Sequence, residues 1–153
     1  QALLLAVSGE GSDSSYEIVG AENSKAWVRN VSAIDLVEQT LIEVSGMVDL
    51  PSPYNPADWQ YEMDSAYLDL GYGEQKYQGT IAAQVLAAWE PSAGAQTVIF
   101  YSADEQVELT LDEISADRSL RIWSVNTATG TTFALATESG EVYLTGIERI
   151  EVK

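Results

Sequence analysis

The chain has 153 residues, and its 24 acidic and 7 basic side chains give a formal net charge of −17 at pH 7. It contains no cysteine and no histidine, which excludes disulfides, thiolate nucleophiles, histidine bases and the usual ligand sets of zinc and haem. An apolar fraction of 46% predicts a folded protein, and the length predicts a single domain over residues 1–153.

The negative charge also limits the partners. Affinity for DNA or RNA depends on basic side chains that neutralise phosphates, so we expect no nucleic-acid binding. No apolar run approaches the roughly 20 residues of a membrane-spanning helix. Because the sequence begins with Gln1, we expect a missing upstream segment and an extracytoplasmic protein, secreted or membrane-anchored. The acidic surface is either a solvated coat or a docking face for a basic partner or cations.

Short strands and one helix are predicted for the first 46 residues. Ser32 is a suitable N-cap for a helix of about two turns that contains Ile34 and Val37. The segment 41–44 is either the end of that helix or the next strand, which Gly46 would end. Three earlier apolar or alternating runs predict strands, at residues 3–8, 16–19 and 26–29.

Residues 49–59 carry three of the four prolines and predict an ordered surface loop without repetitive structure. Tyr54 and Trp59 are expected to be its exposed aromatic pair. Several acids surround this loop and the next turn, and their oxygens could hold a hard cation such as calcium. These acids are Asp49, Asp58, Asp64, Asp69 and Glu74.

The middle of the chain predicts a strand at residues 67–70, a glycine turn at residues 71–73 and a helix over residues 79–89. Thr80 is placed as the N-cap of this helix, and Pro91 stops it. Its apolar residues are spaced for one buried face. They are Ile81, Val85, Leu86 and Trp89.

The remaining third predicts mainly strands. The apolar run 97–100 is expected to be a central strand covered on both faces, and 107–111 alternates as a half-exposed strand does. Asp112 and Glu113 suit the start of a short helix. Four further strands follow, at residues 120–125, 132–135, 141–144 and 147–152. Trp27, Trp89 and Trp123 are assigned to the core, and the class is α+β, with mixed β-sheets and a few short helices.

Several segments together resemble the molybdopterin-binding domain of the sulfite oxidase family. An aromatic-x-Gly segment at Tyr77 and Gly79 leads into a helix with paired aliphatic residues. Residues 94–104 match a Gly-Ala-x-x-Val-x-Phe-x-Ser-Ala-Asp pattern, residues 109–113 a Leu-x-Leu-Asp-Glu helix entry, and residues 150–152 a final Ile-Glu-Val strand. The resemblance covers about residues 33–152 and implies the α+β fold of that domain.

The chain departs from the family where the family holds its metal. Family enzymes ligate molybdenum through a cysteine in a Thr-Leu-Glu-Cys-Ala-Gly-Asn-Gly-like turn, whose counterpart here is residues 67–73. Leu70 would then occupy the thiolate position, and it cannot bind a metal. An arginine that meets the cofactor phosphate is replaced by Glu74, which would repel that phosphate. We therefore expect a degenerate member without catalytic activity and without a metal site.

The two turns that line the family's cleft supply the candidate pocket residues, namely Asp69, Leu70, Tyr72, Glu74, Tyr101 and Asp104. The first interpretation is a non-catalytic module that binds a protein partner or a small molecule, with no cofactor or with a neutral pterin. The second is a subunit that retains the cofactor through backbone groups. The third is an acidic cation-binding or protein-interaction domain unrelated to pterin chemistry. A glycosidase would need a pair of acids across a cleft, and the sequence selects none.

Overall fold

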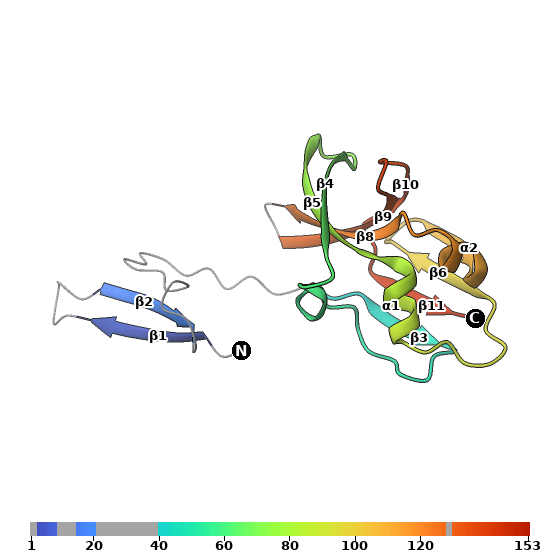
Figure 1. Ribbon diagram of the computed structural model, residues 1–153, viewed down its shortest axis with the longest axis horizontal. Helices are drawn as coiled ribbons and strands as arrows, with labels where there is room; N and C mark the ends of the chain where they lie inside the picture. The colour runs from blue at the N-terminus through green and yellow to red at the C-terminus, as the bar shows by residue number, and fades with distance from the viewer. Residues whose placement is uncertain (1–2, 9–14, 21–39, 128–129) are drawn as a thin grey trace. The chain divides into compact units, whose positions relative to one another are not determined.

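The computed structural model describes residues 3–8, 15–20, 40–127 and 130–153. The chain divides into two compact units, Gln1–Val37 and Glu38–Lys153. In the first unit, β1 (Leu3–Ser8) and β2 (Ser15–Gly20) form an antiparallel pair (Figure 1), which confirms the strands predicted at residues 3–8 and 16–19. The predicted strand 26–29, the helix with its N-cap at Ser32, and Trp27 lie outside the described residues. The single domain over residues 1–153 stays a prediction.

The second unit contains a five-stranded antiparallel sheet with the order β10-β9-β8-β5-β4. Its outer hairpin, β4 and β5, extends as a long curved ribbon (Figure 1). The inner strands β8 and β9 consist mainly of buried residues, since both faces of the sheet are covered there. The strands are β4 (Asp64–Asp69), β5 (Glu74–Ile81), β8 (Leu120–Thr127), β9 (Gly130–Thr137) and β10 (Val142–Thr145).

The other sheet is mixed and has the order β3-β11-β6-β7. β3 (Glu43–Gly46) pairs parallel with β11 (Arg149–Val152), whereas β6 (Thr97–Tyr101) is antiparallel to both β11 and β7 (Gln106–Thr110). The helical segments are the 3₁₀ turn η3 (Pro56–Trp59), α1 (Ala82–Ala88) and α2 (Leu111–Ala116). The α+β class with a mixed sheet and short helices is thus confirmed. None of the helices among the described residues is long and apolar enough to cross a membrane.

Two apolar clusters lie on opposite faces of the five-stranded sheet. The main core joins α1 and α2 to both sheets, with Val85, Phe100, Ile122, Phe133 and Ile150 all buried. The smaller cluster consists of Leu68, Leu70, Tyr77, Trp123, Val125, Ala134 and Ala136. Trp123 and Trp89 are both buried, as predicted.

The helix predicted from residue 79 begins later than expected. Residues 79–81 continue β5, and α1 starts only at Ala82. Thr80 is therefore not an N-cap. It lies fully buried in the strand, where its Oγ1 is 3.0 Å from the hydroxyl of Tyr54. The tertiary contact with Tyr54 takes the hydroxyl that a cap would have used.

The prediction that Tyr54 is exposed was wrong. Only 1% of Tyr54 is exposed, because its ring packs edge-on against Phe133 at a centroid distance of 5.6 Å. Ile42 and Tyr54 also form a β-bridge, which draws the proline-rich segment onto the core. Burial raises the pKa of Tyr54 to about 12. Trp59 is half-buried in η3, so the segment is not free of regular structure.

Candidate functional site

The turn between β4 and β5 holds four of the six predicted site residues. The side chain of Asp69 orders this turn, since its Oδ1 accepts the backbone N–H groups of Gly71 at 2.9 Å and Gly73 at 3.1 Å. Both glycines have positive φ angles, 91° and 82°, a conformation that costs other residues more. Asp69 and Glu74 are paired across the hairpin, and both line a shallow pocket of about 370 Å³ with Ser139 and Gly140. We call it the hairpin pocket.

The other two residues of this turn do not line the hairpin pocket. Tyr72 lies at the tip and is 49% exposed. Leu70 is 1% exposed and packs in the smaller apolar cluster, so its side chain is a core residue. None of the described residues that line the hairpin pocket is basic, and the two carboxylates there would repel a phosphate. The residues present therefore do not fit the phosphate-bearing molybdopterin.

Tyr101 and Asp104 belong to the mixed sheet and do not line the hairpin pocket. The hydroxyl of Tyr101 donates to Glu151 at 2.8 Å, and the guanidinium of Arg149 lies 3.8 Å from its ring centroid. The hydrogen bond from Tyr101 is the main reason that the pKa of Glu151 is below its usual range, with Lys153 and Arg149 adding to it. Asp104 is exposed in the turn between β6 and β7. The side chain of Tyr101 thus makes its contacts with residues of its own sheet.

The acidic residues that suggested a cation site do not all lie together in the structure. Asp64 pairs with Arg121 at 3.0 Å, and Asp49 accepts a hydrogen bond from Ser92. Asp58 lies in η3, on a different element from Asp69 and Glu74. Within the described ranges, no three acidic side chains are grouped so that they could hold a metal ion.

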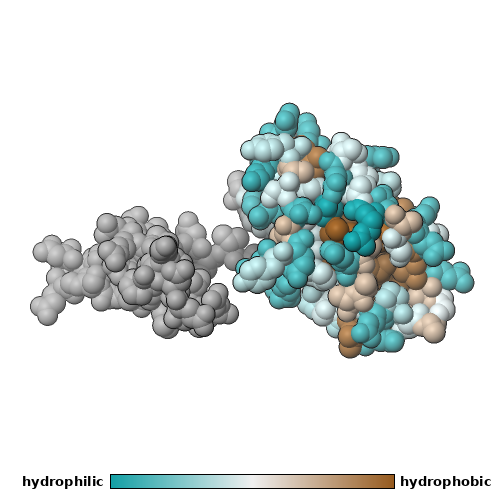
Figure 2. All heavy atoms as spheres, viewed as in Figure 1, coloured by the Kyte–Doolittle hydropathy of each residue, from teal (hydrophilic) through white to brown (hydrophobic). Residues whose placement is uncertain are grey.

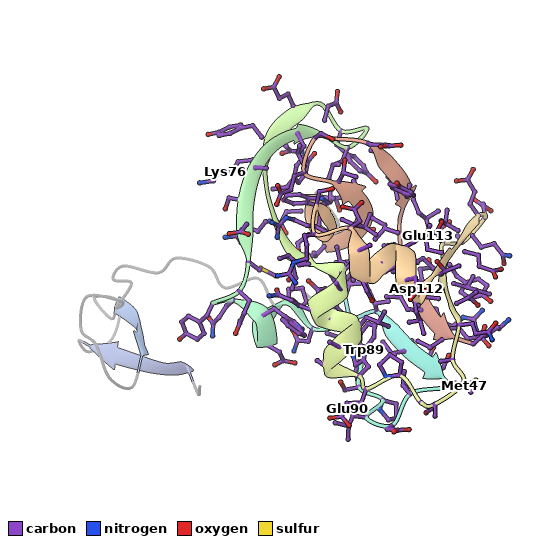
Figure 3. All side chains as sticks on the ribbon, turned by 45° about the vertical axis from the view of Figure 1, so that its right-hand side comes forward. Met47, Lys76, Trp89, Glu90, Asp112 and Glu113 are labelled. Atoms are coloured by element: carbon purple, nitrogen blue, oxygen red, sulfur yellow. The ribbon has the colours of Figure 1, made fainter. Side chains whose placement is uncertain are left out.

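A larger pocket, of about 450 Å³, opens between β7, α2 and β10. We call it the Tyr143 pocket. Leu109, Ala116 and Leu120 give it an apolar floor, and its remaining lining residues are Glu113, Asp117 and Tyr143. Figure 3 shows Glu113 projecting from α2, and Figure 2 shows hydrophilic residues over much of the visible face of the second unit, with hydrophobic patches between them.

The pKa of Tyr143 is affected by the charged groups around this pocket. Desolvation is the main reason that the pKa of its phenol is raised, and the carboxylates of Glu141, Asp117 and Glu113 raise it further. A negative field disfavours the phenolate and favours any cation that enters. The pocket thus combines an aromatic ring, an apolar floor and the carboxylates of Glu113 and Asp117, with Glu141 adding to the negative field from outside the lining.

The position of Glu113 is fixed by a capping box at the start of α2. Thr110 Oγ1 accepts the backbone N–H of Glu113 at 3.1 Å, and Glu113 Oε2 accepts the backbone N–H of Thr110 at 2.7 Å. The carboxylate also accepts the hydroxyl of Thr110 at 2.8 Å. The short helix predicted from Asp112 is confirmed and begins one residue earlier, at Leu111, but the cap itself was missed. The Ser/Thr-x-x-Glu spacing of residues 110–113 was the signal for it.

We predict that Thr110→Ala raises the pKa of Glu113 towards its ordinary value. The hydrogen bonds from the backbone and side chain of Thr110 are what lower it in the intact protein. Thr110→Ser keeps the hydroxyl and is expected to keep the low pKa. Carboxyl NMR titration of both variants measures the effect, and an equal pKa in the two would contradict the role of the hydroxyl.

The residues of the Tyr143 pocket were not predicted as a site from the sequence. β7 and α2 follow each other in the chain, but Leu120 of β8 and Tyr143 of β10 join them only through the packing of the folded protein, and the strand containing Tyr143 carries no motif. The local signals that existed were the capping box and the alternation of β7.

No protein-family model matches the chain, and no curated protein matches it either. One solved structure that it resembles is the sulfane dehydrogenase SoxCD from Paracoccus pantotrophus, at 13% sequence identity and a TM-score of 0.48. The match covers 95% of this chain and 48% of that chain, so the present chain spans about half the length of that neighbour.

Proposed function

We propose that this chain is a non-catalytic module, related to the molybdopterin domain, that binds a basic segment of a protein partner through the Tyr143 pocket. One observation carries the proposal. A single phenol, that of Tyr143, lies in the field of three carboxylates above an apolar floor.

A lysine or arginine side chain has an apolar stem that matches the apolar floor and a positive charge that matches the carboxylates. Its methylene stem is apolar and would pack on Leu109 and Leu120, as such stems do on apolar surfaces. Its charged head would meet Glu113 and Asp117, and a guanidinium would also gain from the face of the Tyr143 ring. The net charge of −17 would speed the encounter with a basic partner, an effect that salt weakens.

The second candidate ligand is a neutral pterin in the hairpin pocket. The observation in its favour is that Asp69 and Glu74 both line that pocket, where their carboxylates could accept the amino and ring N–H donors of a pterin. Its test is elemental analysis with released-pterin fluorescence on freshly purified protein. A pterin near one per chain would support this candidate, and molybdenum near one per chain would overturn the non-catalytic proposal.

The test of the partner site uses a fluorescent heptapeptide with one central arginine. Glu113→Gln/Asp117→Asn removes two charges from the pocket, while glutamine and asparagine can still accept the hydrogen bonds that Thr110 and Ser119 donate. We expect at least a tenfold rise in the Kd of the peptide, about 1.4 kcal/mol of binding free energy.

The matched control is Glu108→Gln/Asp112→Asn, which removes two charges from β7 and α2. Both residues are exposed and neither lines the pocket. This control is expected to change the Kd less than threefold. Equal losses in the two double variants would mean that the peptide responds only to net charge, which would overturn the proposed site.

A further inference from the structure

The five-stranded sheet separates between β5 and β8. β5 pairs with β4 along its length, from Glu74 to Gly79, but it pairs with β8 only over residues 78–81. The last rung is Gln78 opposite Ser124. Beyond it β8 stays paired with β9 through Thr127, whereas β4 is the only strand among the described residues that pairs with residues 74–77 of β5. The sheet therefore opens into a wedge between two of its inner strands.

A pocket of about 260 Å³ lies in this wedge, and we call it the wedge pocket. Its lining includes Ser65, Lys76 and Gln78 from the β4–β5 hairpin and Ser124 and Asn126 from β8. Ser65, Gln78 and Ser124 are cross-strand neighbours in register, so their side chains share one face of the sheet. Lys76, which extends outward in Figure 3, is the one charged residue of this lining.

Two polar groups of the wedge pocket have no hydrogen-bond partner in the part of the chain that the structure describes. The Oγ of Ser124 is buried and has no hydrogen-bond partner within the described residues. A buried hydroxyl is normally hydrogen-bonded to protein or to ordered water, so this one can turn and bond a water molecule or a ligand group in the pocket that Ser124 lines. Asn126 accepts a hydrogen bond from Thr131 through its Oδ1 at 3.1 Å, which leaves its N–H donors available.

The shape of the wedge selects a compact ligand over a peptide strand. An inserted strand needs about 4.8 Å of spacing on each of its sides. Since β5 and β8 are still hydrogen-bonded at the Gln78 and Ser124 rung, the closed end of the wedge has no room for one. The volume of the wedge pocket is also just below the roughly 300 Å³ at which pockets for drug-sized ligands begin. A pocket of this size fits a ligand with a single ring.

The chemistry of the lining selects a neutral polyhydroxylated ligand. Amide and hydroxyl side chains both donate and accept, which matches ligand hydroxyls that do the same. A neutral ligand is also not repelled by the acidic protein. We propose that the wedge pocket binds one neutral sugar ring of a glycan.

The experiment titrates the intact chain with the methyl glycosides of glucose, galactose, mannose and N-acetylglucosamine, followed by ¹H–¹⁵N NMR. At least one glycoside is expected to give saturable shifts centred on Gln78, Ser124 and Asn126. Gln78→Ala should weaken its Kd at least fivefold. Gln106→Ala, an exposed glutamine on β7 outside the pocket, should leave the Kd unchanged.

Two further readouts keep the test decisive. Ser124→Ala is expected to fold with an undiminished melting temperature and yet bind the glycoside more weakly, because the hydroxyl has no hydrogen-bond partner among the residues that the structure describes. Glu113→Gln/Asp117→Asn should leave glycoside binding intact, which separates this site from the Tyr143 pocket. No saturable shift with any of the four glycosides, or shifts at these residues only with an extended peptide, would overturn the proposal.

Discussion

Gly79→Ala is expected to lower the free energy of unfolding by about 2–3 kcal/mol, the upper range for overpacking a core. A methyl group at this position would lie 2.5 Å from Cε3 and 2.7 Å from Cδ2 of Trp123. The indole cannot move away easily, because it is fully buried and its Nε1 donates to the carbonyl of Ala136 at 3.0 Å. Urea unfolding of the two proteins measures the difference.

A double-mutant cycle with Trp123→Leu identifies the cause of that loss. Leucine removes the ring that the new methyl group would strike, so Gly79→Ala should cost less than about 1 kcal/mol in that background. If alanine costs the same amount in both backgrounds, the ring is not the obstacle. The result also bears on the wedge pocket, since Gly79 and Trp123 form the rung next to Gln78 and Ser124.

Asp64→Asn/Glu138→Gln should lower the free energy of unfolding by about 3 kcal/mol, the lower end of the cost of breaking a buried ion pair. Arg121 is 4% exposed. Its Nε donates to Glu138 at 2.8 Å, its Nη2 contacts both Glu138 and Asp64, and its guanidinium lies 6.0 Å from the ring centroid of Trp123. Neutralising both acids leaves a buried cation without an anion. The exposure of the two carboxylates places the effect at the low end.

Glu62→Gln/Glu108→Gln is the charge-matched control for this prediction. Both glutamates are exposed, and removing them relieves the same amount of net negative charge. We expect a change within about 0.5 kcal/mol in either direction. Similar losses of stability in the two double variants, by urea unfolding, would show that Arg121 does not depend on its acidic partners.

The strands of the second unit could be predicted because the order of apolar and polar residues in each strand matches its burial. Residues 97–100 are continuously apolar and form β6 in the interior of the mixed sheet, while the alternation of 107–111 matches the half-exposed β7. The helix after β5 was misplaced because apolar residues at positions 81, 85 and 89 fit a helix whether or not the strand continues into it. The deciding contact, between Thr80 and Tyr54, joins residues 26 positions apart.

Site residues could be predicted only where they are close together in the sequence. Asp69, Tyr72 and Glu74 occur together because one glycine turn carries them, and pattern reasoning recognises such a turn. Tyr101 and Asp104 were joined to them by a family resemblance, and the structure places them on the other sheet. The Tyr143 pocket depends on the packing of β7, α2 and β10, which no spacing in the sequence reveals.

¹H–¹⁵N chemical-shift mapping of the arginine heptapeptide on the intact chain tests whether the Tyr143 pocket is the partner site. We expect saturable shifts confined to this pocket, centred on Glu113, Asp117 and Tyr143, that weaken as salt is added. Shifts spread evenly over acidic side chains across the surface, or centred on the hairpin pocket at Asp69 and Glu74, would contradict it.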